Sequence, residues 1–209
     1  IWTHDAFRVG EDGPTHQPIE HEAQIRLMEQ LKNHSGKNSM LVLRPADHAE
    51  TLVAYKLALQ NTDTPTGLIL SRQNITSLPA TQGTRLQDAA QAVKGAYIVQ
   101  KESQKADVVL VASGSEVSLI KAAADILLQN SVDCRVVSVI SEGIFKTQDT
   151  DYQTSIFPND VPVFGVTAGL PSTLLALVGD LDIIHGLVHF GCSAPAEVLD
   201  EKFGFTPEN

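Results

Sequence analysis

Continuous runs of Val, Ile and Leu, separated by amphipathic stretches, dominate the hydrophobic pattern of this chain. Six apolar runs have the length and residue types of buried strands: 39–44, 66–70, 107–112, 134–140, 161–166 and 183–189. Strands that are apolar on both sides are typical of parallel sheets covered by helices on both faces. The pattern therefore predicts an α/β fold, and residues 1–4 are predicted to be the tail of one further strand.

Helices are predicted between these strands from cap residues and 3.6-residue spacing. Pro18 suits the first turn of one helix, and the D-x-x-E spacing of residues 47–50 predicts a capping box for the next. The S-x-x-E spacing of residues 113–116 predicts a third capped helix, ending near residue 128. Short helices are also predicted at 174–178 and after Pro195. The residues expected to face inward are Ile25, Met28 and Leu31 in the first helix and Leu52, Tyr55 and Leu59 in the second.

The density of apolar residues falls between residues 75 and 104, apart from a short strand-like run at 97–99. We interpret residues 81–104 as a linker between two units. The first unit, residues 1–80, is predicted to be an incomplete α/β unit, and the second unit, residues 105–209, a small doubly wound domain with a mostly parallel sheet.

Composition excludes several classes of function. The 209 residues carry a formal net charge of −10 without a basic patch, which argues against nucleic-acid binding. No apolar run approaches the roughly 20 residues needed to cross a bilayer, and no signal-peptide pattern is present, so we expect neither a membrane protein nor an exported one. Cys134 and Cys192 lack the spacing of a metal or redox site and are expected to be reduced.

Polar residues follow three predicted strand ends or turns, where α/β sheets collect their ligands. These are His4, the turn from Asp12 to His16, and Arg72. Taken singly, each is more typical of a solvated surface or a turn. Together, a guanidinium and two imidazoles are suited to holding a sugar phosphate.

These residues lie in motifs that resemble the transketolases, the thiamine-diphosphate enzymes of the pentose phosphate pathway. The resemblance rests on THD at 3–5, GEDGPTHQPIE at 10–20, RPAD at 44–47 and LSRQN at 70–74, of which the GEDGPTHQP stretch is highly specific. SGSEV at 113–117, SAPAE at 193–197 and FGFT at 203–206 resemble the C-terminal domain of the same family. The resemblance covers nearly the whole chain.

The resemblance implies that residues 1–80 are the end of a pyrimidine-binding domain and residues 105–209 the C-terminal domain. It also implies a cytoplasmic, homodimeric transferase that moves a two-carbon ketol unit from a ketose phosphate to an aldose phosphate. His4 and Arg72 resemble the substrate-phosphate ligands, and Asp12 the residue that contacts a sugar hydroxyl near the reacting carbon. His16 resembles the histidine beside cofactor and substrate, so His16 and Asp12 are the expected catalytic residues.

Other family motifs have no counterpart here: the Mg²⁺-diphosphate motif, the aromatic cluster for the aminopyrimidine, and the glutamate that activates the cofactor ring. We therefore expect thiamine diphosphate and Mg²⁺ to act in a complete enzyme with an N-terminal part, and neither to bind this chain alone, which is expected to be inactive by itself. No metal ligands are predicted, because the spacing of His16 and His21 is poor for one helical face.

Four features depart from the family pattern. Ala6 and Arg8 stand where Ser and Gly are usual, Thr167 where Glu is frequent, and residues 32–38 look like an insertion in a surface loop. Two alternative interpretations remain at this point. The chain could be part of a related thiamine enzyme, such as a deoxyxylulose-phosphate synthase or a dehydrogenase β subunit, or a non-catalytic dimerisation or regulatory module.

Overall fold

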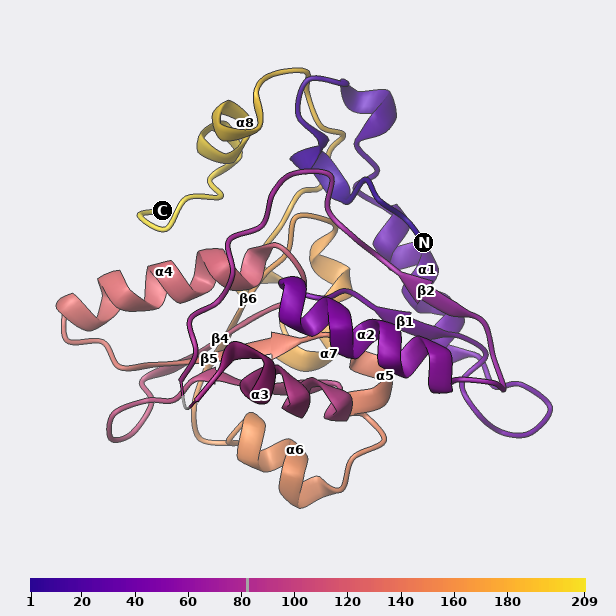
Figure 1. The fold of residues 1–209 in the computed structure, drawn as a ribbon. Helices are drawn as coiled ribbons and strands as arrows, with labels where there is room; N and C mark the ends of the chain where they lie inside the picture. The colour runs from indigo at the N-terminus through magenta and orange to yellow at the C-terminus, as the bar shows by residue number, and fades with distance from the viewer. Residues whose placement is uncertain (82) are drawn as a thin grey trace.

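The computed structural model describes residues 1–81 and 83–209. It contains two sheets, one of two strands and one of five, with helices on both sides of each (Figure 1). The mixed α/β fold with a mostly parallel central sheet, predicted from the apolar runs, is confirmed.

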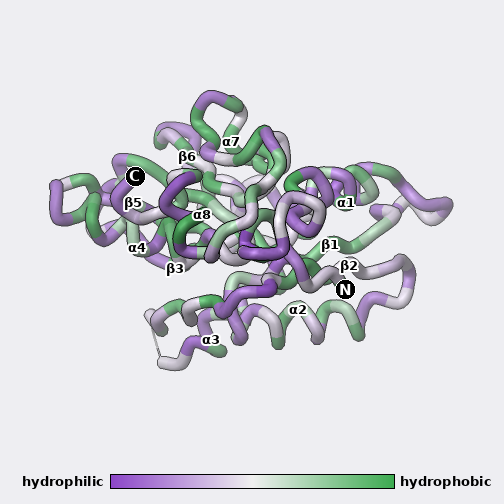
Figure 2. Tube along the Cα trace, turned by 90° about the horizontal axis from the view of Figure 1, so that it is seen from above, coloured by the Kyte–Doolittle hydropathy of each residue, from purple (hydrophilic) through white to green (hydrophobic). Residues whose placement is uncertain are grey.

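The first unit is built on two parallel strands, β1 (Leu41–Leu43) and β2 (Thr66–Leu68). Residues 1–4 form only a single bridge, in which Trp2 pairs with Ile69 beside β2. The helices α1 (His21–Gln30) and α2 (His48–Gln60) lie on opposite sides of this pair (Figure 2). Two 3₁₀ turns precede them, η1 (Ala6–Val9) and η2 (Pro14–His16).

The five strands of the second sheet run in the order β3-β5-β4-β6-β7, and only β3 is antiparallel to its neighbour. Their bounds are β3 (Ala96–Gln100), β4 (Val108–Ala112), β5 (Cys134–Val139), β6 (Val163–Val166) and β7 (Ile184–His185). Every residue of β5 is buried, as its continuous apolar character predicts for a strand inside a covered parallel sheet.

Short helices and turns connect these strands. They are α3 (Arg85–Ala89), η3 (Ala90–Lys94), α4 (Glu116–Gln129), α5 (Glu142–Phe145), α6 (Thr150–Ile156), η4 (Pro171–Thr173), α7 (Leu175–Val178), η5 (Leu181–Ile183) and α8 (Ala196–Phe203). The range 81–104, interpreted above as a linker, thus contains a helix and the edge strand β3, which pairs with β5. The division of the chain into units stays a prediction.

Two of the helix N-caps in the structure differ from those predicted. The side chain of Asp47 caps α2 by accepting from the Glu50 amide, but Glu50 reaches back to the amide of Ala46 and not to that of Asp47. The cap expected at Ser113 is wrong: α4 begins at Glu116, and no side-chain cap is formed there. Glu116 is instead buried and paired with an arginine.

The predicted inward faces of α1 and α2 are also wrong. α1 buries the charged residues Glu22, Arg26 and Glu29, while Met28 and Leu31 are exposed. On α2 the expected core residues form an exposed apolar stripe, with exposed fractions of 58% for Leu52, 41% for Tyr55 and 83% for Leu59. The buried side of α2 consists of Ala49, Glu50, Val53 and Ala54. Periodicity located the helices but not their orientation, because paired charges fill the interior positions of α1.

One apolar core joins the two units. It contains Phe7, Leu43 and Val53 from the first unit together with Ile120 and Phe205 from the second. A smaller core lies among the residues Val109, Val111, Val137, Phe145 and Ile156. Among the residues that the structure describes, no helix combines the length and the apolar character needed to cross a membrane.

The loop interpreted as an insertion closes on itself at the protein surface. Lys32 and Asn38 form an isolated antiparallel bridge, and the side chain of Asn33 accepts hydrogen bonds from the amides of Ser35 and Lys37. The side chains of the loop from Lys32 to Lys37 are mostly exposed, so its additional length disturbs neither sheet.

Candidate functional site

The segments that carry His4 and Arg72 leave neighbouring strands at the same end. The amide of Trp2 donates to the Leu68 carbonyl at 2.8 Å, and the amide of Leu70 donates to the Trp2 carbonyl at 2.7 Å. His4 follows the bridged residue Trp2 by two positions and Arg72 follows its partner Ile69 by three, so both lie where α/β folds place their ligands.

The loop from Gly10 to Pro18 lies between the Arg72 segment and the second unit. Its glycines are needed for its shape, since Gly10 has φ +87° and Gly13 φ +79°, in the left-handed region that side chains disfavour. The Gln73 side chain donates to the Val9 carbonyl at 3.3 Å, beside Gly10. Ser193 of the second unit donates to the Glu11 carbonyl at 2.6 Å. The loop is thus held from both sides.

Gln17 provides the central contact of this loop. Its side chain is fully buried, and Nε2 donates to the Gly10 carbonyl at 2.6 Å and to the Cys192 carbonyl at 2.9 Å. Gly191 leaves room for it, because a Cβ at that position would come within 1.6 Å of Gln17 Oε1. One amide group therefore joins the two ends of the loop and ties them to the second unit.

The four predicted site residues, His4, Asp12, His16 and Arg72, are all exposed. His4 and His16 are each oriented by a neighbouring threonine, whose hydroxyl lies 2.9 Å and 3.0 Å from the respective Nδ1 atom. Within residues 1–81 and 83–209, no hydrogen bond or ion pair joins two of these four side chains. The structure therefore brings the segments together and leaves the side chains open to a ligand.

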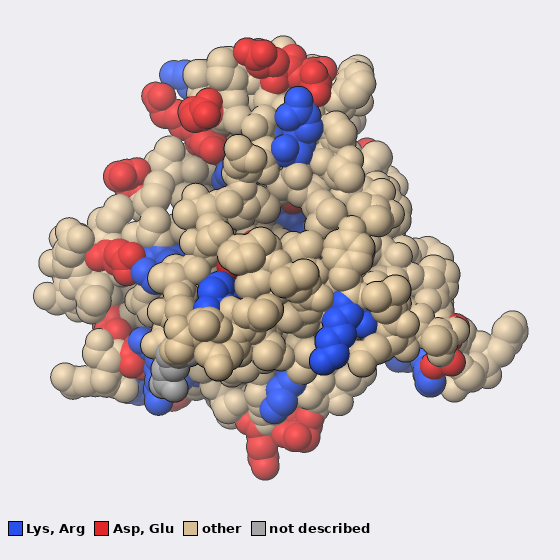
Figure 3. Space-filling view, in the orientation of Figure 1, with Lys and Arg blue, Asp and Glu red and all other residues tan. Residues whose placement is uncertain are grey.

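Acidic side chains gather at this end of the molecule, over α8 and the N-terminal loop (Figure 3). The exposed carboxylates include those of Glu11, Asp12, Glu197 and Glu201. A negative surface repels anions, so any attraction for a phosphate has to come from cationic groups placed directly at the site. Arg72 is such a group, because its guanidinium offers a bidentate fork.

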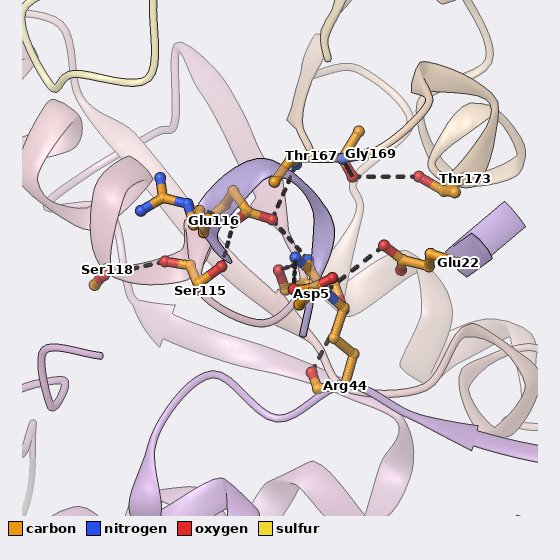
Figure 4. A network of polar contacts seen from close by, with 12 residues as sticks. Asp5, Glu22, Arg44, Ser115, Glu116, Ser118, Thr167, Gly169 and Thr173 are labelled. Atoms are coloured by element: carbon orange, nitrogen blue, oxygen red, sulfur yellow. Dashed lines mark hydrogen bonds and ion pairs between the residues drawn. The ribbon is translucent and has the colours of Figure 1, made fainter. Parts of the chain in front are cut away.

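A buried charge cluster lies beneath the loop, around the guanidinium of Arg44 (Figure 4). Arg44 Nε donates to Asp5 Oδ2 at 2.9 Å, and Nη1 lies 2.7 Å from Glu116 Oε2. Glu22 Oε2 is 3.6 Å from Arg44 Nε, and Nη1 also donates to the Ser113 carbonyl. Arg44 thus connects the residue after His4 with the first residue of α4.

Three carboxylates share this one guanidinium, and burial together with the neighbouring charges shifts the pKa of two of them, Asp5 and Glu22. Burial, opposed by Arg44, raises the pKa of Asp5 to about 6, and the charges of Glu116 and Glu22 add to the rise. Glu22 has a second partner, Arg26, whose Nε donates to Glu22 Oε1 at 2.8 Å. With Arg44 and Arg26 outweighing its burial, the pKa of Glu22 is lowered.

A second buried cluster lies away from the candidate site, between α2 and β3. Glu50 Oε1 accepts hydrogen bonds from Tyr97 at 2.7 Å and from Ser138 at 2.8 Å. Arg85 Nη2 donates to the Tyr97 oxygen at 2.6 Å, and its Nε donates to Asp47 at 2.7 Å. This cluster ties the first unit to β3 and β5 of the second sheet.

Three of the positions expected above to depart from the family pattern, Ala6, Arg8 and Thr167, are engaged in the fold. Ala6 is buried with φ +47°, a left-handed conformation that is costly for a residue with a Cβ. Arg8 points to α8 and pairs with Asp200 at 3.2 Å. Thr167 is buried and accepts hydrogen bonds from the Gly169 amide at 3.2 Å and the Thr173 hydroxyl at 3.4 Å.

Sequence reasoning missed both buried clusters. Asp5, Arg44 and Glu116 lie within the motifs that carry the family resemblance, but no local pattern shows that they meet. The sequence contains one indication of the first cluster, because Arg44 directly follows an apolar run. A cation buried at such a position requires acidic partners. In the part of the chain that the structure describes, no group of three His, Cys, Asp or Glu side chains is arranged to hold a metal ion.

Comparisons with known proteins agree with this architecture. The family model for the transketolase-like C-terminal domain matches residues 95–206, and that for the transketolase pyrimidine-binding domain matches residues 1–77. Transketolase 2 of Vibrio parahaemolyticus is 40% identical over the whole chain, which spans 30% of that relative.

Solved transketolase structures share the fold. The enzyme from Leishmania mexicana superposes with a TM-score of 0.83 at 38% identity, covering 99% of this chain and 28% of its own. The Pichia stipitis transketolase solved in complex with sedoheptulose-7-phosphate gives a TM-score of 0.81 at 37% identity, with the same two coverages. The chain spans less than a third of these relatives, and it belongs to the transketolase family.

Proposed function

We propose that this chain provides the sugar-phosphate-binding and acid–base part of a thiamine-diphosphate-dependent transketolase. The reaction is the transfer of a two-carbon ketol unit from a ketose phosphate to an aldose phosphate in the cytoplasmic pentose phosphate pathway. The observation that supports the proposal is that His4 and Arg72 follow paired segments at one end of the fold, and that Gln73, next to Arg72, contacts the start of the loop that carries Asp12 and His16. The sugar-phosphate complex of the Pichia stipitis relative supports it.

Arg72 and His4 are assigned to the phosphate group of the substrate. Arg72 is exposed and offers two parallel N–H donors, which match the oxygens of a phosphate. The Thr3 hydroxyl lies 2.9 Å from His4 Nδ1, which leaves Nε2 as the ring nitrogen that faces a ligand. The guanidinium of Arg72 and the imidazole of His4 would together outweigh the repulsion that the acidic surface exerts on a phosphate.

Asp12 and His16 are assigned to the reacting end of the sugar. A carboxylate such as Asp12 accepts a hydrogen bond only from a hydroxyl of matching position, so it would select among sugar stereoisomers. The imidazole of His16 offers a ring nitrogen that can accept a proton, which suits the removal of a hydroxyl proton. Thr15 fixes Nδ1 of this ring and leaves Nε2 for the substrate.

We expect this chain to contribute only part of a site for thiamine diphosphate. His16 is the one residue assigned beside it, and no carboxylate or histidine cluster for a metal occurs among the described residues. When bound in the enzyme, the cofactor would supply the electron sink that the cleavage of a carbon–carbon bond requires. We therefore assign Mg²⁺ and diphosphate binding to the N-terminal part of the relatives, which this chain does not span.

An apolar surface on α2 supports pairing with another polypeptide. Leu52, Tyr55 and Leu59 follow one another at helical spacing and are all exposed. Contiguous exposed apolar stripes mark protein interfaces. We propose that the N-terminal part of the enzyme covers this stripe, because the chain spans only 30% of the length of its relative.

The test combines this chain with the N-terminal part of a transketolase relative and measures ketol transfer from xylulose phosphate to ribose phosphate. Arg72→Ala should raise KM for the phosphorylated sugars by about tenfold or more, with a smaller change in kcat, because a charge-assisted contact is lost. Lys101→Ala provides a control, since it removes an exposed cation that is not among the candidate site residues. A wild-type KM in the Arg72→Ala enzyme would refute the phosphate assignment.

A second measurement addresses the cofactor. Calorimetric titration of this chain alone with thiamine diphosphate and Mg²⁺ should show no micromolar binding, whereas the combined protein should bind. Micromolar binding by the chain alone would contradict the assignment of the diphosphate site to the N-terminal part.

A further inference from the structure

Arg8 lies in η1, midway along the segment that connects His4 with Asp12, and its guanidinium points to the C-terminal helix α8. Nη2 lies 3.2 Å from Asp200 Oδ1, and Nη1 donates to Asp200 Oδ2 at 3.4 Å. Nε lies 3.3 Å from Glu116 Oε1. One side chain thus pairs with carboxylates from α8 and from the first turn of α4.

Aromatic rings enclose the same guanidinium. Its central carbon lies 5.5 Å from the ring centroid of Phe7 and 5.9 Å from that of Phe205, both of which are buried. Phe7 in turn packs edge-on against Phe203, the last residue of α8, at 5.3 Å. Only 16% of the Arg8 side chain is exposed, so the ion pairs are partly desolvated and less screened by salt than surface pairs.

The backbone beside Arg8 needs support from such contacts. Ala6 is held at φ +47°, a left-handed conformation that is costly for a residue with a Cβ. On one side Asp5 is anchored by Arg44, and on the other Arg8 is anchored by Asp200 and Glu116. The strained residue therefore lies between two charged anchors.

We propose that Arg8 is a positioning residue, which fastens η1 to α8 and thereby sets where His4 and Asp12 stand relative to each other. The attachment of η1 to α8 is supported by the contacts described above, whereas its effect on catalysis rests on the proposed function. A glycine at this position could form none of these contacts. In this chain the geometry of the candidate site consequently depends on the docking of its C-terminal helix.

The fastening is tested by hydrogen exchange on the chain combined with the N-terminal part of a relative. Arg8→Ala and Asp200→Asn should each accelerate amide exchange in residues 6–17 and 196–203 by about tenfold, as expected for a lost charge-assisted hydrogen bond. The double variant should exchange no faster than the faster single variant, because Asp200→Asn removes an ion pair that Arg8→Ala already removes. Arg8→Lys should fall between wild type and Arg8→Ala, and Lys202→Ala, at an exposed position on α8, should leave the 6–17 exchange unchanged.

The positioning role is tested on the same proteins by kinetics. Arg8→Ala should raise KM for the phosphorylated donor sugar several-fold, with partial recovery in Arg8→Lys. The contact between η1 and α8 would be refuted if amide exchange in residues 6–17 stayed unchanged, or if the effects of the two single variants were additive. The positioning role would be refuted if exchange became faster while KM stayed unchanged. Failure of the proposed function itself is distinguishable, because it would appear as a wild-type KM in Arg72→Ala.

Discussion

Arg44 Nη1 lies 2.7 Å from Glu116 Oε2 with both side chains fully buried, so the residue after β1 is ion-paired to the first residue of α4. This pair, extended by Asp5 and Glu22, lies between the two sheets. The two units are therefore joined by ion pairs as well as by apolar contacts. The segment that carries the candidate site is attached to this cluster through Asp5.

Loss of Arg44 should be among the most destabilising substitutions in the chain. Arg44→Ala leaves up to three buried carboxylates without their common partner, which typically costs about 3–5 kcal/mol of the free energy of unfolding. Chemical denaturation measures the effect, and Arg44→Lys, which keeps the charge but loses the planar fork, should recover part of it. Lys121→Ala is the control: its pair with Asp125 is at the surface, and its loss should cost less than about 1 kcal/mol. Equal costs for the two alanine variants would contradict the buried-cluster interpretation.

Asp5 should make the stability of the chain depend on pH. Its pKa is raised from 3.8 to about 6 by burial, so between these values the folded state holds a proton that the unfolded chain has released. Stability contributed by this proton is present below about pH 4 and is lost as the pH rises through 6, with a slope of at most about 1.4 kcal/mol per pH unit.

The Asp5 titration is isolated by comparison with Asp5→Asn, which cannot ionise. The difference in unfolding free energy between wild type and Asp5→Asn should shift in favour of the variant from pH 4.5 to pH 7.5. A difference that stays constant over this range would show that Asp5 is ionised throughout.

Gln17 should control the loop from Gly10 to Pro18. Gln17→Ala leaves the Gly10 and Cys192 carbonyls without their donor, at a cost of roughly 1–3 kcal/mol. Amide exchange in residues 10–17 and 191–193 should accelerate more than exchange in β5. Gln24→Ala, at an exposed position on α1, serves as the control, and uniform acceleration over the whole chain would contradict a local role.

Tyr97 should matter through its hydroxyl group. Burial and the charge of Glu50 raise its pKa, so the phenol stays protonated and donates to that carboxylate at 2.7 Å. Tyr97→Phe keeps the ring but removes the hydrogen bond and should lower stability by about 1.5–3 kcal/mol, measured by denaturation. Tyr152→Phe is a useful comparison, because its hydroxyl donates to a neutral backbone carbonyl, and its loss should cost less. The reverse order of the two costs would contradict the argument.

The strands could be predicted from the sequence because their signal is local. A buried parallel strand needs apolar residues on both sides, and runs such as 107–112 and 134–140 show this directly. Strand β3 was recognised as a short apolar run, but its place in the sheet depends on pairing with β5, which lies 36 or more residues further along the chain. Sequence pattern carries no information about such a partner.

The helix faces could not be predicted because tertiary contacts override periodicity. On α1 the buried positions belong to Glu22, Arg26 and Glu29, and their burial is stable only because partners such as Arg44 arrive from another element. The candidate site residues were found from strand ends and motifs, whereas Gln17 and Arg8 act through contacts with residues more than 170 positions away.

The charged junction between the two sheets also limits how this chain can be recombined with its relatives. A chimera that replaces the second half would import whatever side chains its donor carries opposite Arg44 and Arg8. Such an exchange should fold well only if the donor brings a glutamate at the entry of its α4 and an acidic residue at the position of Asp200. A donor that matches only the apolar contacts would leave Arg44 and Arg8 without acidic partners.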